Sequence, residues 1–371
     1  MYQDIGIYIA GPECFYRNGF ARLDTMRRLA EDYGFAVTLP NDRPLDLNHE
    51  DLRKNADAIF ANCRESMNRS AAIIADLELF RGTEPDGGTV YEIGMAYALG
   101  LKCYAYTRDK RNMAYKYQNA VLRDGVVHDR EGRVLPYQDL PFGPMIIGSC
   151  KVLEGTYEDC LKLLTLDLEE ERKAKAKREI AAVDSSRGIT LARSDKIRAY
   201  LAGPARYDAD GRQRYAKMKE LCARHHIEAI TPLDEAPGVA TVEAADPYVR
   251  AYNTFDRWQQ HVRNCDLIIA DLNDFHGWEP NSDTAFECGM AFQLGKKLYG
   301  YMNDTTIMKE RIPNYGAAQK YKDIYDWDVE NFNYPINLMF ASSMKIGEGD
   351  FAAILPEVAR DLQSDSQSRR S

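Results

Sequence analysis

The chain carries the same set of short motifs twice, in the same order. The first copy reads Tyr8-Ile-Ala-Gly-Pro12, then Ala71-Ala-Ile-Ile-Ala-Asp76, then Glu84-Pro-Asp86-Gly-Gly-Thr89-Val-Tyr-Glu92-Ile-Gly-Met-Ala96. The second reads Tyr200-Leu-Ala-Gly-Pro204, then Asp266-Leu-Ile-Ile-Ala-Asp271, then Glu279-Pro-Asn281-Ser-Asp-Thr284-Ala-Phe-Glu287-Cys-Gly-Met-Ala291. The offset is 192 residues at the tyrosines and 195 at the glutamates. A repeat of this period has the size of a whole domain, so the sequence predicts a duplicated domain rather than a solenoid.

Length and composition agree with two soluble domains. A chain of 371 residues predicts about two domains, and 45% hydrophobic with 28% charged residues is ordinary for a globular enzyme. The net charge of −9 argues against a nucleic-acid partner, which needs basic patches, and against an anionic membrane surface. No apolar run is long enough to span a bilayer.

The chain start and the cysteines indicate a cytoplasmic location. The first residues lack the basic start and the apolar stretch of a signal peptide. The eight cysteines form no Cys-x-x-Cys pair and are interpreted as free thiols in a reducing compartment. Cys222-x-x-His225 has no second pair to complete it, so no metal site is expected.

Short apolar runs alternate with segments of helical spacing in each copy. In the first copy we expect strands at 5–10, 35–39, 71–77 and 103–106, and helices at 17–33, 52–69 and 89–99. The second copy repeats this order between residues 198 and 301. Such alternation predicts two α/β domains, each a parallel sheet flanked by helices.

The predicted domain boundaries follow from the segment between the copies. Residues 157–183 are rich in Leu, Glu, Lys and Ala, which predicts a long helix whose 169–177 charge run is a solvated face. A hinge is expected at 184–188. The chain is therefore divided into a domain at 1–166, a connector at 167–196, a second domain at 197–363 and a polar tail at 364–371.

The motifs of the first copy place two carboxylates and a tyrosine at one edge of the sheet. Ligands of open α/β sheets bind at the carboxyl ends of the strands, where Tyr8, Asp86 and Glu92 fall. Gly87 and Gly88 would let a ligand approach the backbone. The positive end of the helix dipole favours an ionised Glu92. An ionised carboxylate beside a tyrosine hydroxyl is a nucleophile for an electrophilic carbon, and a second carboxylate resembles the pair that cleaves glycosidic bonds with retention.

Each of these residues also has a purely structural interpretation. Asp86 could cap the following helix, Glu92 could lie on a helix surface, and Tyr8 could be a core residue with a satisfied hydroxyl. The recurrence of Tyr and Glu at matched positions of both copies favours a functional role.

The motifs resemble those of the nucleoside 2-deoxyribosyltransferase family over nearly all of both copies. The specific part is Asp86-Gly-Gly-Thr89-x-x-Glu92-x-Gly after the strand that ends at Asp76. The resemblance implies a flavodoxin-like, or Rossmann-like, fold, no cofactor, and exchange of the nucleobase on a deoxynucleoside, a reaction of nucleotide salvage. It implies that Glu92 attacks C1′, that Tyr8 holds Glu92, and that Asp86 lies near the sugar.

The resemblance also implies that a neighbouring subunit donates an asparagine in a Pro-x-Asn-Leu-Met phrase. The second copy has Asn337 in Pro335-Ile-Asn337-Leu-Met339, whereas the first copy has Pro144 at that position. The second copy in turn has Asn281 for Asp86 and Asp283 for Gly88. The copies look complementary, so we expect an internal pseudo-dimer with one composite site. Two independently degenerate copies, or a second site at Tyr200 and Glu287, are the alternatives, and the pseudo-dimer could assemble further.

Other substrate contacts are expected from position. Gly11 and Gly88 are expected to contact the substrate, and Asn41 and Asp42, after the second strand, to contact the base. Some family members have an aspartate on the helix before the third strand that is proposed to protonate the leaving base. That position here holds Cys63 beside Asn62, and the second copy reads Asp256-Arg-Trp258. Neither Cys63 nor Asn62 is an effective acid, although Asn62 could bind the base, so the general acid stays open.

Three functions fit these residues. The first is deoxyribosyl transfer between bases, with deoxynucleosides and nucleobases as partners. The second is hydrolysis of the N-glycosidic bond of a nucleoside or nucleotide by the same glutamate. The third is a non-catalytic nucleotide sensor. Asp86 favours nucleosides over nucleotides, because a carboxylate accepts a hydrogen bond from a 5′-hydroxyl but repels a 5′-phosphate.

Overall fold

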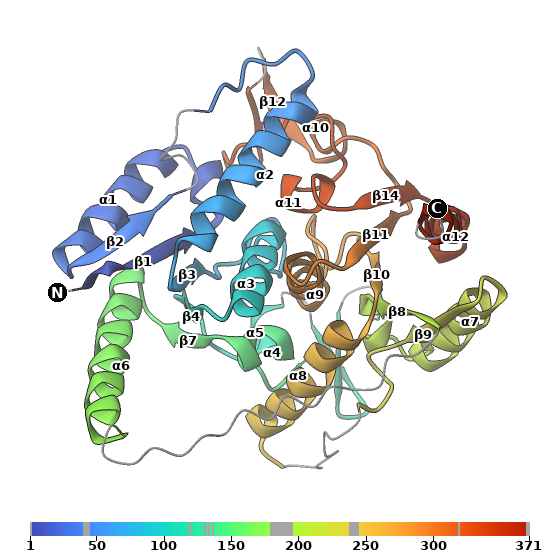
Figure 1. The fold of residues 1–371 in the computed structure, drawn as a ribbon, viewed down its shortest axis with the longest axis horizontal. Coiled ribbons are helices and arrows are strands. Elements are labelled where there is room, and N and C mark those ends of the chain that lie inside the picture. The colour runs from blue at the N-terminus through green and yellow to red at the C-terminus, as the bar shows by residue number, and fades with distance from the viewer. Residues whose placement is uncertain are drawn as a thin grey trace.

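The computed structural model describes residues 2–39, 45–117, 120–129, 132, 134–135, 137–178, 196–236, 245–317 and 320–368. Asn41, Asp42 and the hinge predicted at 184–188 lie outside these residues. We call the part from residue 2 to 178 the first half and the part from 196 to 368 the second half. In Figure 1 the first half lies on the left and the second half on the right.

The first half is built on a five-stranded parallel sheet. Its strand order is β2-β1-β3-β4-β7, with strands at Tyr2–Ala10 (β1), Phe35–Thr38 (β2), Ala72–Asp76 (β3), Lys102–Thr107 (β4) and Lys151–Glu154 (β7). In strand rank this is the order 2-1-3-4-5 of flavodoxin-like folds. Strand β3 is buried along its whole length, as expected for an apolar strand covered on both faces.

The second half repeats this sheet. Its strand order is β9-β8-β10-β11-β14, with strands at Ile197–Ala202 (β8), Ile227–Ile230 (β9), Leu267–Asp271 (β10), Lys297–Met302 (β11) and Lys345–Glu348 (β14). The prediction of two α/β domains with parallel sheets is therefore confirmed, and both are flavodoxin-like.

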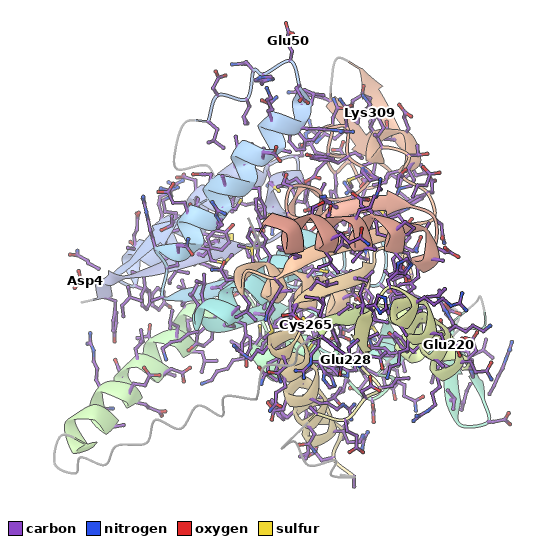
Figure 2. All side chains as sticks on the ribbon, turned by 45° about the vertical axis from the view of Figure 1, so that its right-hand side comes forward. Asp4, Glu50, Glu220, Glu228, Cys265 and Lys309 are labelled. Atoms are coloured by element: carbon purple, nitrogen blue, oxygen red, sulfur yellow. The ribbon has the colours of Figure 1, made fainter. Side chains whose placement is uncertain are left out.

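Helices cover both faces of each sheet. The outer faces carry α1 (Gly19–Asp32) and α6 (Tyr157–Arg178) in the first half, and α7 (Gly211–Arg224) and α12 (Phe351–Ser368) in the second. The inner faces carry α2 (Leu52–Asn68), α3 (Gly87–Leu99), α5 (Pro144–Ser149), α8 (Pro247–Asn264), α9 (Ser282–Gln293) and α11 (Leu338–Ala341). One apolar core of both halves fills the space between the sheets. Charged side chains such as Asp4, Glu50 and Glu220 lie on the periphery, whereas Cys265 is buried (Figure 2).

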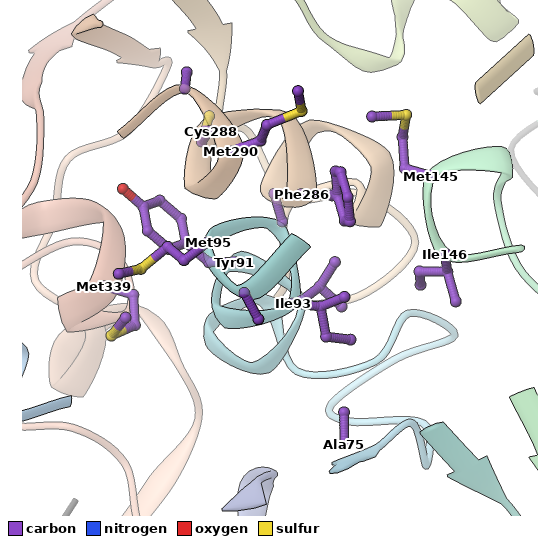
Figure 3. Packing of buried hydrophobic residues seen from close by; sticks show 14 of the residues in the cluster. Ala75, Tyr91, Ile93, Met95, Met145, Ile146, Phe286, Cys288, Met290 and Met339 are labelled. Atoms are coloured by element: carbon purple, nitrogen blue, oxygen red, sulfur yellow. The ribbon is translucent and has the colours of Figure 1, made fainter. Parts of the chain in front are cut away.

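Helices α3 and α9 pack against each other at the centre of the molecule (Figure 3). Their close approach depends on a symmetric pair of glycines. A Cβ built on Gly94 would lie 2.2 Å from the carbonyl oxygen of Phe286, and one on Gly289 would lie 1.9 Å from that of Tyr91. Any larger residue would push the halves apart, so the Glu-x-Gly motif of each copy serves the interface as well as the site.

Several elements were not predicted from the sequence. They include β7 and β14, the hairpins β5–β6 (Val121–Arg123 and Val126–His128) and β12–β13 (Asn314–Ala317 and Lys320–Asp323), the short helices α4 (Met113–Lys116), α5, α10 (Met308–Arg311) and α11, and helix α12. The long helix predicted from residue 157 is α6, which crosses residue 166, where the first domain was predicted to end, and α12 continues into the predicted tail.

Candidate active site

Tyr8 and Glu92 meet in the interior of the first half. Tyr8 lies on β1 and Glu92 on the second turn of α3, and the Tyr8 hydroxyl donates to Oε1 of Glu92 at 2.5 Å. Tyr8 is completely buried and Glu92 is 8% exposed. Burial raises the pKa of Tyr8 well above its usual range, so the hydroxyl keeps its proton and acts as a donor.

Burial also changes the charge of Glu92. The pKa of Glu92 is raised to about 8, mainly by loss of hydration and also by the nearby Asp86, against the lowering effect of hydrogen bonds from Tyr8 and Cys63. The expectation that the helix N-terminus keeps Glu92 ionised at neutral pH is therefore not met. The desolvation of a carboxylate in this interior exceeds the stabilisation by the helix dipole.

Asp86 both caps α3 and presents an oxygen to the cavity. Its Oδ2 accepts hydrogen bonds from the backbone N–H and the hydroxyl of Thr89, each at 2.7 Å. Its buried Oδ1 has no hydrogen-bond partner among the described residues. The structural and functional interpretations of Asp86 thus apply to different oxygens of one carboxyl group.

A cavity of about 140 Å³ joins these carboxylates. Its lining combines polar groups of both halves with apolar side chains of η1 (Pro12–Phe15), α1 and α2. The lining residues are Ile9, Gly11, Cys14, Phe15, Phe20, Leu23, Ile59, Cys63, Asp86, Gly88, Thr89, Glu92, Glu330, Asn337, Leu338 and Met339. Phe20 is 66% exposed, as a large apolar residue at a cavity mouth would be.

The second half contributes Asn337 to this cavity. Asn337 caps α11 by accepting the N–H of Met339 at 2.9 Å, and its amide lies against Gly88 of the first half. A Cβ on Gly88 would approach Asn337 Nδ2 to 2.7 Å. The glycine that we expected to admit a ligand therefore admits a side chain of the other half.

The same junction is fixed by a reciprocal pair of glutamates. Glu279 of the second half accepts the N–H of Gly87 at 3.0 Å, and Glu84 of the first half accepts the N–H of Ser282 at 3.1 Å. Both glutamates are buried. Each half thus satisfies a free N–H at the start of the other half's central helix, which links the geometry of the site to the pairing of the halves.

The remaining predicted contacts divide into three groups. Gly11 and Gly88 line the cavity. Asn62 is buried on α2 but is not a lining residue, whereas its neighbour Cys63 is, because adjacent helical residues point about 100° apart. Asn41 and Asp42 lie outside the described residues.

Tyr200 and Glu287 repeat the Tyr8–Glu92 contact in the second half, with the hydroxyl 2.7 Å from Oε1. There Arg206, absent from our sequence prediction, completes a two-pronged ion pair with Glu287 at 2.8 and 2.6 Å. The Arg206 and Glu287 side chains are 1% and 0% exposed. The carboxylate of Glu287 is therefore already paired with the positively charged side chain of Arg206.

Asp283 fills the rest of this second centre. Its Oδ2 accepts the hydroxyls of Tyr137 and Tyr207 at 2.5 and 2.6 Å, and its Oδ1 accepts the N–H of Met145 at 2.9 Å. Internal hydrogen bonds thus satisfy both oxygens of the Asp283 carboxylate.

The position of Asp283 corresponds to Gly88 in the first copy, and its carboxylate lies against Gly143 of the first half. Gly143 is the N-cap residue of α5 as Asn337 is of α11, so the prediction that Pro144 stands at the position of Asn337 is wrong by one residue.

Sequence reasoning missed Arg206, Cys14 and Glu330. A direct comparison of Gly11-Pro-Glu-Cys14 with Gly203-Pro-Ala-Arg206 would have shown that only the second copy has an arginine at this position. Glu330 lies in a connecting segment outside both motifs, and nothing in its sequence neighbourhood points to the cavity.

A larger groove of about 890 Å³ lies elsewhere, between the two halves, lined by residues such as Tyr16 and Arg108 of the first half and Trp327 of the second. Tyr8, Asp86 and Glu92 are not among its lining residues. Among the described residues, no cluster of three or more His, Cys, Asp or Glu side chains is placed to hold a metal ion. Within the same residues, no helix has the length and apolar character needed to cross a bilayer.

Comparisons with known proteins agree with the duplicated motifs. The family model described as nucleoside 2-deoxyribosyltransferase matches residues 7–142 and again residues 199–339. A search of curated proteins found no match.

Among solved structures, a 2-desoxiribosyltransferase from Leishmania mexicana is 32% identical, with 43% of this chain and 95% of that chain covered and a TM-score of 0.34. A 2-deoxyribosyltransferase from Bacillus psychrosaccharolyticus is 16% identical over 28% of this chain and 72% of that chain, with a TM-score of 0.22. A conserved protein from Enterococcus faecalis V583 is 17% identical over 47% of this chain and 99% of that chain, with a TM-score of 0.26. The chain therefore belongs to the nucleoside 2-deoxyribosyltransferase family and carries the family's domain twice.

Proposed function

We propose that this protein transfers 2-deoxyribose between nucleobases through a covalent deoxyribosyl–Glu92 intermediate. The observation that carries the proposal is the buried Tyr8–Glu92 pair, which faces a cavity that both halves complete. Tyr8 fixes one carboxyl oxygen of Glu92, so the other is oriented for attack. Such an arrangement of nucleophile and orienting group is the general requirement of covalent catalysis.

The reaction has two displacement steps. In the first, the Glu92 carboxylate forms a bond to C1′ while the glycosidic C–N bond breaks, and the base leaves with the electron pair. The departing base takes up a proton on the nitrogen that held the sugar. In the second step, a ring nitrogen of an incoming base attacks C1′, gives up its own proton, and releases Glu92 as a carboxylate. Two displacements at one carbon return the sugar to its original configuration, as in retaining glycosidases.

The lining of the cavity suggests how a deoxynucleoside binds. Asp86, Asn337 and Gly88 offer polar contacts to the sugar, and the free Oδ1 of Asp86 can accept a hydrogen bond from a sugar hydroxyl. The volume of about 140 Å³ is below the range of roughly 300–1,000 Å³ of most ligand pockets, so we expect the base to extend past Phe20 toward the mouth. Burial raises the pKa of the Cys63 thiol, which makes Cys63 a poor proton donor to the base.

One working site per chain follows from the contrast between the halves. Glu92 borders a cavity, whereas Glu287 is held by Arg206 in the interior. The second half then serves the reaction by supplying Asn337 and by holding α3 in place. We propose that its own centre has become part of the core.

Incubation with deoxyinosine and adenine tests this function. Formation of deoxyadenosine and hypoxanthine supports transfer. Free deoxyribose with hypoxanthine, and no deoxyadenosine, would show hydrolysis instead, and unchanged deoxyinosine would indicate a binding protein. Glu92→Gln, which keeps the size of the side chain and an acceptor for the Tyr8 hydroxyl, is the matched control and should give no product.

A further inference from the structure

Glu330 brings a third carboxyl group to the cavity. It lies between β13 and α11 in the second half and is half-buried. Its Oε2 accepts the N–H of Leu338 at 3.0 Å, which ties the side chain to the helix that Asn337 caps. Glu330 lines the cavity together with Asp86 and Glu92. The proposed reaction gives it no role so far.

The elements of the site place the three carboxyls along the cavity. Asp86 caps α3 and Glu92 lies on its second turn. Glu330 is held to Leu338 beside Asn337, whose amide lies against the first turn of α3. Glu330 therefore borders the end of the cavity where α3 begins, near Asp86, which raises the pKa of both glutamates. A sugar whose C1′ faces Glu92 would direct its far hydroxyl toward this end.

Glu330 is the member of the Asp86–Glu330 pair that holds a proton. Asp86 accepts two hydrogen bonds from Thr89, which favour its charged form, while Glu330 accepts one from Leu338. Loss of hydration and the neighbouring Asp86 raise the pKa of Glu330 to about 8. At neutral pH one carboxyl can donate a hydrogen bond and the other can only accept. A hydroxyl, which both donates and accepts, matches this pair.

The closed centre of the second copy takes a donor from the matching segment of the first half. The backbone N–H groups of Leu135 and Val329 make matching hydrogen bonds to the preceding strand of each half. Tyr137 follows Leu135 by two residues, and Glu330 follows Val329 by one. The Tyr137 hydroxyl donates to Asp283, whereas Glu330 borders the open cavity, where a substrate oxygen can accept instead.

We propose that Glu330 is a specificity-determining residue which donates a hydrogen bond to the 5′-hydroxyl of the deoxynucleoside, while the free oxygen of Asp86 accepts from it. The inference rests on the proposed function. It gives the second half a role in substrate recognition beyond Asn337.

The experiment compares two variants on two substrates. Glu330→Gln keeps both an N–H donor for the hydroxyl and an acceptor for Leu338, whereas Glu330→Leu keeps only the bulk. Each is assayed with a 2′-deoxynucleoside and with its 2′,5′-dideoxy analogue. Wild type and Glu330→Gln should prefer the 5′-hydroxyl by about 10- to 100-fold in kcat/KM, and Glu330→Leu should lose most of that preference. The preference is a ratio of two kcat/KM values measured on the same variant. Partial unfolding of Glu330→Leu lowers both values equally and therefore does not change the ratio.

A second readout is the pH dependence of binding. Above pH 8 wild-type Glu330 ionises and loses its donor, so KM for the deoxynucleoside should rise, while KM of Glu330→Gln should not. Tyr137→Phe, which removes a donor from the closed centre, should leave the substrate ratio unaltered. If wild type is active and Glu330→Leu shows the same substrate ratio as wild type, this inference is overturned while the proposed function stands. If wild type transfers no deoxyribose, the proposed function fails, and equal calorimetric affinities of wild type for the two nucleosides would then overturn the inference as well.

Discussion

Gly88 and Asn337 lie so close that no side chain fits between them. A Cβ at position 88 would be 2.7 Å from Nδ2 and 2.8 Å from Oδ1 of Asn337. The two residues are far apart in the sequence and belong to different halves, yet both line the cavity that contains Glu92. The site therefore depends on how the halves pair, and residues at the junction should affect catalysis.

Asn337→Ala should reduce kcat/KM for a deoxynucleoside by about ten- to a thousand-fold, because the amide can both donate to and accept from the sugar. The change also removes the cap of α11. Asn337→Asp separates the two effects, since it keeps the capping oxygen but has no amide donor. If Asn337→Asp retains wild-type kinetics, the amide does not contact the substrate. Steady-state assays with circular dichroism as a check of folding provide the measurement.

Glu92→Gln should lower turnover by at least about a thousand-fold, because a covalent nucleophile has no substitute. Mass spectrometry of wild type mixed with a deoxynucleoside, without an acceptor base, should detect the chain plus one deoxyribosyl group. The adduct should be absent from Glu92→Gln and present in Glu287→Gln. An adduct that maps to Glu287 would contradict the model of one working site.

Glu287→Ala should lower the free energy of unfolding while it leaves most of the turnover. Removing the carboxylate leaves the Arg206 guanidinium, 1% exposed, without its partner in the core. Breaking a buried ion pair in this way costs about 3–5 kcal/mol, whereas replacing both partners by apolar residues is often neutral. The Arg206→Met/Glu287→Met double variant should therefore recover most of the lost unfolding free energy in urea. Equal losses in both variants would show that the ion pair is not the cause.

Cys14→Arg should mask Glu92 in the first half, as Arg206 masks Glu287 in the second. Cys14 holds the position of Arg206 after the Gly-Pro turn and lines the cavity. An arginine there would pair with Glu92 and mask the nucleophile, so we expect a loss of activity on the order of a hundred-fold or more with the fold intact. Cys14→Met adds bulk without charge. An equal loss in Cys14→Met would assign the effect to crowding rather than to the ion pair.

The sequence predicted the fold and part of the site because both are encoded in local patterns. Apolar runs such as the strand ending at Asp76 and the helix beginning near Thr89 fixed the α/β order, and the duplicated motif led to Tyr8, Asp86 and Glu92. The fifth strands were missed because Lys151–Glu154 and Lys345–Glu348 are short and half-polar. They become strands through pairing with β4 and β11, which no local pattern reveals.

The charge states and cross-half contacts could not be predicted in the same way. The raised pKa of Glu92 depends on how completely the second half excludes water from α3. The closure of the second centre depends on Arg206 reaching Glu287, 81 residues further along the chain. Both are consequences of packing between distant segments rather than of spacing within a motif.

The buried carboxyls should make the protein less stable as the pH rises from about 5 to 8. Burial raises the pKa of Glu84 and of Glu92 to about 8, whereas in the unfolded chain both return to their ordinary value near 4.5. Between these values the folded state holds protons that the unfolded state has released. Each such group therefore removes up to about 1.4 kcal/mol of stability per pH unit over that window.

Thermal unfolding at a series of pH values checks this sign. The Tm should fall from pH 5 to pH 8, and Glu84→Gln, which keeps an acceptor for the N–H of Ser282, should show a shallower fall. Over the same window kcat/KM should rise with pH, because only ionised Glu92 can attack C1′. A Tm that rises toward pH 8 would mean that these carboxyls are ionised in the folded protein. Stability and activity should thus change in opposite directions, since both follow the loss of protons from the same buried carboxyl groups.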